Sequence, residues 1–205
     1  MFKSSNNVQQ RTIAFFDFDG TITTKDSMLE LAKFSRGAAG YYAGMVAISP
    51  YLIAMKIGLL SNDKAKEKLL SHFFGDMSLN DFNTLCRRFC NECLPSLIRP
   101  AALKKIKEYQ AANIEVVIVS ASAENWISDW CNDNGIKYIA TKLKVVDGKI
   151  TGKLDGINCN GIEKVNRIKL LYDPANYSTI YCYGDSSGDQ PMLQLATESF
   201  FKPFR

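Results

Sequence analysis

Three short apolar runs in this chain each end in small or polar residues, at residues 13–16, 114–119 and 179–183. Runs of this length that are bounded by turn-forming residues are typical of buried strands. A segment with helical periodicity follows each of them. Because strands that alternate with helices pair in parallel, the pattern predicts an α/β protein with a three-layer, Rossmann-like parallel sheet core.

Between the first and second runs, the spacing of apolar residues is helical. The predicted helices occupy residues 26–34, 62–74 and 78–97, with two shorter helices within residues 41–60. We expect Asp26 or Ser27 to cap the first helix, because their side chains accept hydrogen bonds from free backbone N–H groups.

The absence of a strand pattern in this stretch predicts a helical cap domain, residues 23–97, inserted after the first strand. Residues 1–22 and 98–205 are then expected to form the core. Within the core, helices are predicted at residues 101–112, 124–134 and 162–171, a further strand at 137–143, and a hairpin around the turn signal Asp147-Gly148.

The apolar segment 41–60 is about as long as a membrane-spanning helix. Gly44, Pro50, Lys56 and Gly58 interrupt it, and a proline inside a helix breaks or kinks it. We therefore expect two short helices buried in the cap. Firm membrane insertion is not expected, whereas peripheral contact with a membrane stays open.

Composition and charge narrow the class of protein. The net charge of +4 comes without a long block of like charges, so nucleic-acid binding has little support. Lys64, Lys66 and Lys68 alternate with acidic residues, a pattern typical of a solvated helix face. Residues 1–11 lack the apolar stretch of a secretory signal, and we expect a cytoplasmic protein.

Three of the six cysteines, Cys86, Cys90 and Cys93, have the Cys-x3-Cys-x2-Cys spacing of some iron–sulfur proteins. The same spacing places them on one face of the predicted helix 78–97. Free cysteine often packs as a small apolar residue. We therefore expect core packing rather than a metal cluster.

Two aspartates end the first apolar run. Asp17 and Asp19 are separated by one residue, so their side chains leave a strand on the same face. Carboxylates that converge at the end of a buried strand repel each other and are costly to desolvate without a cation or a proton. This arrangement favours a functional site over a simple turn.

Polar residues also follow the other two runs. Ser120 follows the second, Asp185 and Asp189 follow the third, and Lys164 lies in the predicted helix 162–171. Ligands bind beyond the carboxyl ends of the strands in open parallel sheets, so these groups are expected around one crevice. Four acids, a lysine and small hydroxyls together predict a site for a metal ion and a phosphate.

The order of these residues resembles the four motifs of the haloacid dehalogenase superfamily of phosphohydrolases. The matching residues are Asp17-Phe18-Asp19-Gly20-Thr21, Ser120, Lys164, and Gly184-Asp185 with Asp189. The predicted insert resembles the cap of the branch that includes phosphoserine phosphatases. The resemblance implies a magnesium-dependent phosphatase that hydrolyses phosphate monoesters.

The resemblance also implies roles for the acids. Asp17 would be the nucleophile that forms an aspartyl-phosphate, and Asp19 the acid and base. Mg²⁺ would bind the side chains of Asp17 and Asp185 and the backbone carbonyl of Asp19, with Asp189 supporting the site. The single histidine, His72, is far from these motifs in sequence and is expected to be a cap residue.

Substrate contacts are expected from Thr21, Asp26, Ser120, Ala121 and Lys164. The hydroxyls, backbone N–H groups and ammonium would hold the phosphate, and Lys164 would also steady the transferred group. Asp26 would meet an amino group, if the substrate has one.

Four positions depart from the phosphoserine phosphatase pattern: Gly20, Asp26, the pair Ala121-Ser122, and Gly188. The expected partner is therefore a small phosphorylated metabolite or a lipid phosphate, with phosphoserine and phosphatidylglycerophosphate as specific alternatives. Two other classes stay open, a receiver-type phospho-switch and a non-catalytic binding protein on the same fold. The sequence does not indicate the oligomeric state.

Overall fold

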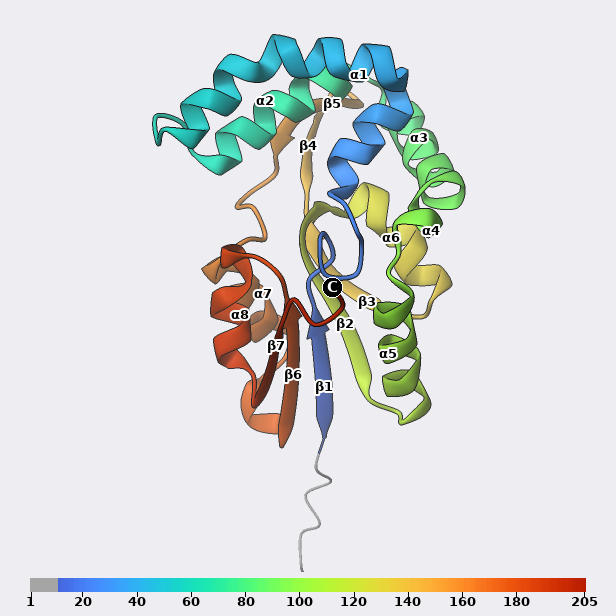
Figure 1. Ribbon diagram of the computed structural model, residues 1–205, viewed down its shortest axis with the longest axis vertical. Coiled ribbons are helices and arrows are strands. Elements are labelled where there is room, and N and C mark those ends of the chain that lie inside the picture. The colour runs from blue at the N-terminus through green and yellow to red at the C-terminus, as the bar shows by residue number, and fades with distance from the viewer. Residues whose placement is uncertain (1–10) are drawn as a thin grey trace, which may run out of the picture.

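The protein, described here from a computed structural model over residues 11–205, is a parallel sheet with helices on both faces and, at one end, a helical segment that we call the cap (Figure 1). The sheet order is β3-β2-β1-β6-β7, with every neighbouring pair parallel. The strands are β1 Thr12–Phe16, β2 Glu115–Ala123, β3 Lys137–Thr141, β6 Thr179–Gly184 and β7 Glu198–Phe201. The predicted α/β class is confirmed. The prediction about a secretory signal falls on residues 1–10, outside the described range.

Successive residues of β1 serve opposite faces of the sheet. Ala14 and Phe16 belong to one buried cluster, together with residues of α5 and α6. Ile13 and Phe15 belong to a second cluster, together with residues of α7 and α8. A strand that is covered on both faces needs an unbroken apolar run, which is why this segment could be recognised in the sequence. The core helices are α5 Pro100–Ala111, α6 Glu124–Asp133, α7 Ile162–Leu171 and α8 Gln190–Leu195.

The segment between β1 and α5 is helical, as predicted, and covers the carboxyl ends of the strands (Figure 1). Its helices are α1 Ser27–Lys56, α2 Asn62–Phe74, α3 Leu79–Glu92 and α4 Leu94–Leu97. Phe73 and Phe82 from this segment lie in the same buried cluster as Phe18 and Trp126 of the core. Cap and core therefore share one continuous apolar interior.

The predicted hairpin is present as β4 (Leu143–Val146) and β5 (Lys149–Leu154). It rises from the core and packs against the cap: the backbone N–H of Asp76 donates to the carbonyl of Ile150 at 2.9 Å, and the Ser71 hydroxyl donates to the carbonyl of Thr151 at 3.2 Å. The hairpin thus lies with the helical segment in space, although the predicted boundaries assign it to the core. Those boundaries stay a prediction.

The expectation of two short helices in residues 41–60 is wrong, because α1 continues through Pro50. Proline removes an N–H donor, which leaves the carbonyl of Val46 without its helical partner. The hydroxyl of Ser49 donates to that carbonyl at 2.8 Å instead. The helix bends at Gly37, whose φ of 67° lies in the left-handed region that glycine tolerates.

Two of the three cysteines of the helical segment pack as predicted. Cys86 and Cys90 are buried on the apolar face of α3, and Cys93 forms the C-cap of that helix rather than part of its face. Burial raises the pKa of the Cys90 thiol to about 11, so the thiol is neutral at physiological pH. In the described part of the chain, the acid cluster that could hold a metal contains no cysteine.

Gly20 directly follows Asp19. Its surroundings show how closely the first motif approaches the loop that contains Asp185. Its φ is 78°, and a Cβ there would overlap the carboxylate of Asp185. Gly148 in the hairpin turn has a similar φ of 71°, but a Cβ at Gly148 would meet no atom within 4 Å.

We expect Gly148→Ala to lower the free energy of unfolding by about 1 kcal/mol through backbone strain, and Gly20→Ala to lower it further. If urea denaturation gives the same loss of unfolding free energy for both variants, Gly20 does not lie close to the Asp185 carboxylate.

Candidate active site

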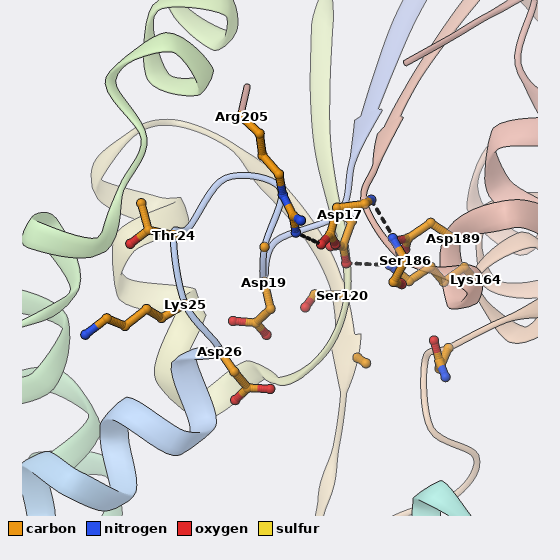
Figure 2. A pocket seen from close by; sticks show the side chains of 14 residues that line it. Asp17, Asp19, Thr24, Lys25, Asp26, Ser120, Lys164, Ser186, Asp189 and Arg205 are labelled. Carbon is orange, nitrogen blue, oxygen red and sulfur yellow. Dashed lines mark hydrogen bonds and ion pairs between the residues drawn. The ribbon is translucent and has the colours of Figure 1, made fainter. Parts of the chain in front are cut away.

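The carboxyl ends of β1, β2 and β6 meet at one edge of the sheet, below the cap. There they surround a cavity of about 410 Å³, which is lined by all of the predicted site residues except Thr21 (Figure 2). The residues come from segments that lie far apart in sequence. The prediction that the polar clusters at these strand ends share one crevice is confirmed.

Lys164 lies between two of the acids. Its Nζ donates to Oδ1 of Asp17 and to Oδ1 of Asp189, both at 2.6 Å, and all three side chains are buried. Burial lowers the pKa of Lys164, but attraction to Asp17 and Asp189 outweighs it, so the pKa is raised and the ammonium stays charged. The lysine therefore serves as a fixed internal cation.

Asp17 is the most constrained acid of the site. Burial raises the pKa of its carboxyl to about 7, although the charge of Lys164 partly offsets that rise. The hydroxyl of Thr21 donates to Asp17 Oδ2 at 3.2 Å. Thr21 thus helps to orient Asp17 from behind, which explains why it does not line the cavity.

Asp189 is held by its own turn. Its Oδ2 accepts hydrogen bonds from the backbone N–H of Asp185 at 3.1 Å and from the N–H and hydroxyl of Ser186 at 2.9 and 2.8 Å. Burial raises the pKa of Asp189, but Lys164 and these donors outweigh that effect and lower it. Asp189 is thus a fully engaged carboxylate that shapes the loop after β6.

Asp185 projects into the cavity from that loop. It forms an ion pair with Arg205, whose side chain reaches the cavity from the segment after β7 (Figure 2). Burial raises the pKa of Asp185 in spite of that partner. The sequence interpretation missed Arg205, because nothing in the last residues indicates that they return to the site. The ring of Phe204 stacks on Tyr183 of β6 with centroids 5.5 Å apart, and this contact places Arg205.

The acids suit a hard divalent cation. Asp17, Asp185 and Asp189 each offer an oxygen within 4.8 Å of the others, and carboxylate oxygens are the ligands that Mg²⁺ prefers. Asp189 accepts four hydrogen bonds, whereas Asp17 accepts two and Asp185 has its ion pair with Arg205, so Asp17 and Asp185 are the side chains better able to bind an ion. Asp185 would exchange Arg205 for the ion in doing so.

Asp19 is directed toward the cap side of the cavity. Its Oδ1 accepts the backbone N–H of Ser27 at 2.7 Å, and its Oδ2 accepts the hydroxyl of Ser122. Trp126 donates to the Ser27 hydroxyl at 3.0 Å, and that hydroxyl lies 3.0 Å from the hydroxyl of Ser122. The first turn of α1 therefore fixes the orientation of the Asp19 side chain. Asp26 forms the N-cap of the same helix by accepting the N–H of Leu29 at 3.0 Å.

Ser120 and Ala121 form the turn at the end of β2. The Ser120 Oγ accepts the backbone N–H of Ser122 at 2.9 Å, which leaves the hydroxyl proton free to donate into the cavity. A phosphate oxygen is a suitable acceptor for that donor.

Lys66 corrects the prediction of a solvated lysine face on α2. Lys64 and Lys68 are exposed, but Lys66 turns toward the core and donates to the carbonyl of Ala121 and to Asn158 Oδ1, the latter at 2.9 Å. Burial lowers the pKa of Lys66 to about 8, although the charges of Asp19 and Asp26 oppose that change. The sequence held one signal for this contact, because Asp63, Lys66 and Leu70 recur on a single helical face.

His72 lies in α2, where its ring meets Phe73 edge-on at 5.0 Å. It does not line the cavity. This agrees with its expected place in the cap.

Comparisons with known proteins agree with this geometry. The sequence pattern of the haloacid dehalogenase-like hydrolases matches residues 14–194. Protein CicA of Caulobacter vibrioides is 34% identical over 192 residues, covering 93% of this chain and 85% of that protein. A probable phosphatase of Mycobacterium tuberculosis is 30% identical, covering 90% of this chain and 66% of that protein.

Solved structures show the same fold. A Bordetella pertussis protein of unknown function has a TM-score of 0.80 at 22% identity, covering 93% of this chain and 89% of that one. A substrate-bound phosphoserine phosphatase has a TM-score of 0.68 at 18% identity, covering 94% and 86%. From the family pattern and the relatives that share its length, the chain belongs to the haloacid dehalogenase-like hydrolases.

Proposed function

We propose that this protein is a magnesium-dependent phosphatase that hydrolyses a phosphate monoester through an aspartyl-phosphate on Asp17. The observation that carries the proposal is the placement of the Asp17 carboxylate, fixed by Lys164, in a cavity whose other acids can bind a cation. The likeness to phosphoserine phosphatases and to a probable phosphatase supports the same chemistry.

Charge explains why these groups are needed together. A phosphate monoester is a dianion at neutral pH, so an anionic nucleophile that approaches it meets repulsion. Lys164 places one positive charge beside Asp17. Asp17 and Asp185 would hold Mg²⁺, which when bound supplies the further positive charge that phosphoryl transfer requires.

In the first step, a carboxylate oxygen of Asp17 attacks phosphorus, the bond between phosphorus and the ester oxygen breaks, and Asp19 gives a proton to the leaving oxygen. In the second step, Asp19 takes a proton from a water molecule that attacks the same phosphorus. The bond between phosphorus and the Asp17 oxygen then breaks, which releases phosphate and restores both acids. Ser120 and the turn after β2 would hold the phosphate oxygens during both steps.

The cavity and its surroundings favour a small, charged substrate. Lys25 and Asp26 line the cavity on the cap side, where they would meet the part of the substrate beyond the phosphate. A small phosphorylated metabolite or the headgroup of a lipid phosphate fits these surroundings. A screen of phosphorylated metabolites and lipid phosphates against the purified protein tests this choice.

The nucleophile and the acid are tested by isosteric substitution. We expect Asp17→Asn to abolish release of inorganic phosphate from p-nitrophenyl phosphate with Mg²⁺, and Asp19→Asn to slow it about a hundredfold to ten-thousandfold. Asp147→Asn, in the hairpin turn, is the matched control and is expected to leave the rate unchanged. Turnover by Asp17→Asn at the wild-type rate would exclude Asp17 as the nucleophile.

The raised pKa of Asp17 predicts a pH-dependent stability. In metal-free protein its pKa is about 7, against 3.8 for an ordinary aspartate. Between these values the folded chain binds a proton that the unfolded chain has lost. The contribution of Asp17 to the free energy of unfolding is therefore full below the unfolded pKa and is lost as the pH rises through the folded pKa.

The measurement is urea denaturation in a chelator at several pH values between about 4 and 8 for the wild type and Asp17→Asn. The wild type is expected to lose stability relative to the variant as the pH rises toward about 7, and added Mg²⁺ is expected to restore stability to the wild type more than to the variant. Parallel pH curves would contradict the raised pKa.

Lys66 is expected to secure the cap over the substrate. Loss of a charged hydrogen-bond donor at the Ala121 turn should raise the KM of Lys66→Met about tenfold, with a smaller effect on kcat. Because the pKa of Lys66 is about 8, the wild-type KM should rise above that pH, whereas the KM of the variant should not. Lys64→Met, on the exposed side of the same helix, is the control. A KM for Lys66→Met equal to that of the control would remove Lys66 from this role.

A further inference from the structure

The helix α1 has an apolar surface that the protein does not cover. Residues 37–55 contain no Asp, Glu, Lys or Arg. By length and composition α1 could cross a membrane, yet only 11% of its most apolar window is buried within the protein. The expectation that this segment is buried in the cap is therefore wrong.

The exposed side chains form one stripe, which we call the outer face of α1. Tyr42, Val46, Pro50, Ile53 and Ile57 recur at intervals of three or four residues, so they lie on one side of the helix. Val46 is 73% exposed and Ile53 58% exposed. Apolar side chains gathered at this density on a surface mark a contact site.

The opposite side of the same helix is used for packing. Gly44 and Ile48 are buried, and the ring of Tyr41 stacks on Phe73 of α2 with centroids 5.9 Å apart. The outer face therefore points away from α2. Figure 1 shows α1 along the edge of the cap, with α2 on the side nearer the sheet. Because the inner side is tied to α2, the helix is placed to lie along a surface rather than to cross it.

Exposed basic residues lie at the end of α1 and on α2. Lys56 ends α1, and Lys64 and Lys68 lie on the exposed side of α2. The Nζ of Lys68 lies 4.9 Å from the centroid of the Tyr51 ring, so Lys68 lies next to α1, against a residue that is not part of the outer face.

The acids of α2 face the other way. Asp63 accepts a hydrogen bond from Asn158 at 2.8 Å, and Glu67 accepts the backbone N–H of Leu154 at 3.0 Å, so both carboxylates are directed at the core. This division of charge leaves Lys64 and Lys68 on the exposed side of α2, unopposed by the acids of that helix.

From these observations we propose that the outer face of α1, with Lys56, Lys64 and Lys68, docks the protein on a membrane surface that contains anionic lipids. An apolar helix face enters the boundary between headgroups and acyl chains, and flanking lysines bind the negative headgroups. A second copy of the chain suits this face less well, because a symmetric contact would bring the lysines of the two copies together. The proposal does not depend on the phosphatase activity.

The test is sedimentation of the full chain with vesicles of phosphatidylcholine, with and without phosphatidylglycerol. We expect binding to the anionic vesicles, and a loss of affinity of about tenfold or more for Val46→Glu with Ile53→Glu. The matched control is Leu170→Glu with Leu171→Glu on α7, where the side chains are 81% and 67% exposed. Both variants add two negative charges, so a general repulsion by the vesicles would affect them equally.

A second pair of variants leaves the outer face of α1 unchanged, so that misfolding at that face cannot account for a loss of binding. Replacing Lys56, Lys64 and Lys68 by Gln is expected to weaken binding to anionic vesicles about tenfold or more at low salt. The same change at Lys104, Lys107 and Lys169, exposed on the core helices, is expected to weaken it much less. Sedimentation velocity reports the oligomeric state of each variant.

Failure of the wild type to bind either kind of vesicle would overturn the proposal, as would equal losses in the test and control variants. A dimer that dissociates on Val46→Glu with Ile53→Glu, without vesicle binding, would assign the face to a second copy instead. Phosphate release from p-nitrophenyl phosphate in the absence of vesicles should be unchanged in all four variants. Failure of membrane binding can therefore be distinguished from failure of the proposed phosphatase activity.

Discussion

A buried ammonium group holds the acidic edge of this sheet together. Lys164 contacts Asp17 and Asp189 at the same distance of 2.6 Å, and each of the three side chains would be costly to bury without the others. Removing one partner from such a group leaves an uncompensated buried charge, which typically costs about 3–5 kcal/mol. Lys164 lies in α7, Asp17 follows β1 and Asp189 follows β6. These two ion pairs therefore hold α7 against the ends of both strands.

The same arrangement prepares the site for chemistry. Asp189 is satisfied by its turn and by Lys164, whereas Asp17 keeps a pKa raised to about 7 because burial outweighs its single cation. The site thus contains an excess of negative charge that the protein only partly offsets. In the proposed function a bound cation removes that excess and leaves Asp17 ionised beside the phosphorus. The cap adds a second link, since the first turn of α1 binds Asp19 through Ser27.

The sequence was sufficient for the parts of the structure that depend on local pattern. The apolar run before Asp17 identified a strand covered on both faces, and the polar clusters identified the strand ends that meet at the cavity. Other features depend on tertiary contacts that no local pattern records. Lys66 looks like one solvated lysine among three, and only the docking of α2 turns it toward Ala121. Pro50 signals a break, but the Ser49 hydroxyl supplies the bond that the helix would lose. Arg205 reaches Asp185 because Phe204 stacks on Tyr183.

The proposed activity depends most on a covalent bond between phosphorus and one carboxylate oxygen of Asp17. The most direct measurement is to quench a reaction with substrate and Mg²⁺ in acid, reduce the acyl phosphate with borohydride, and sequence the peptides by mass spectrometry. The proposed mechanism predicts conversion of Asp17 alone to homoserine, dependent on substrate. Steady phosphate release with the reduced group at another residue, or at none, would contradict it.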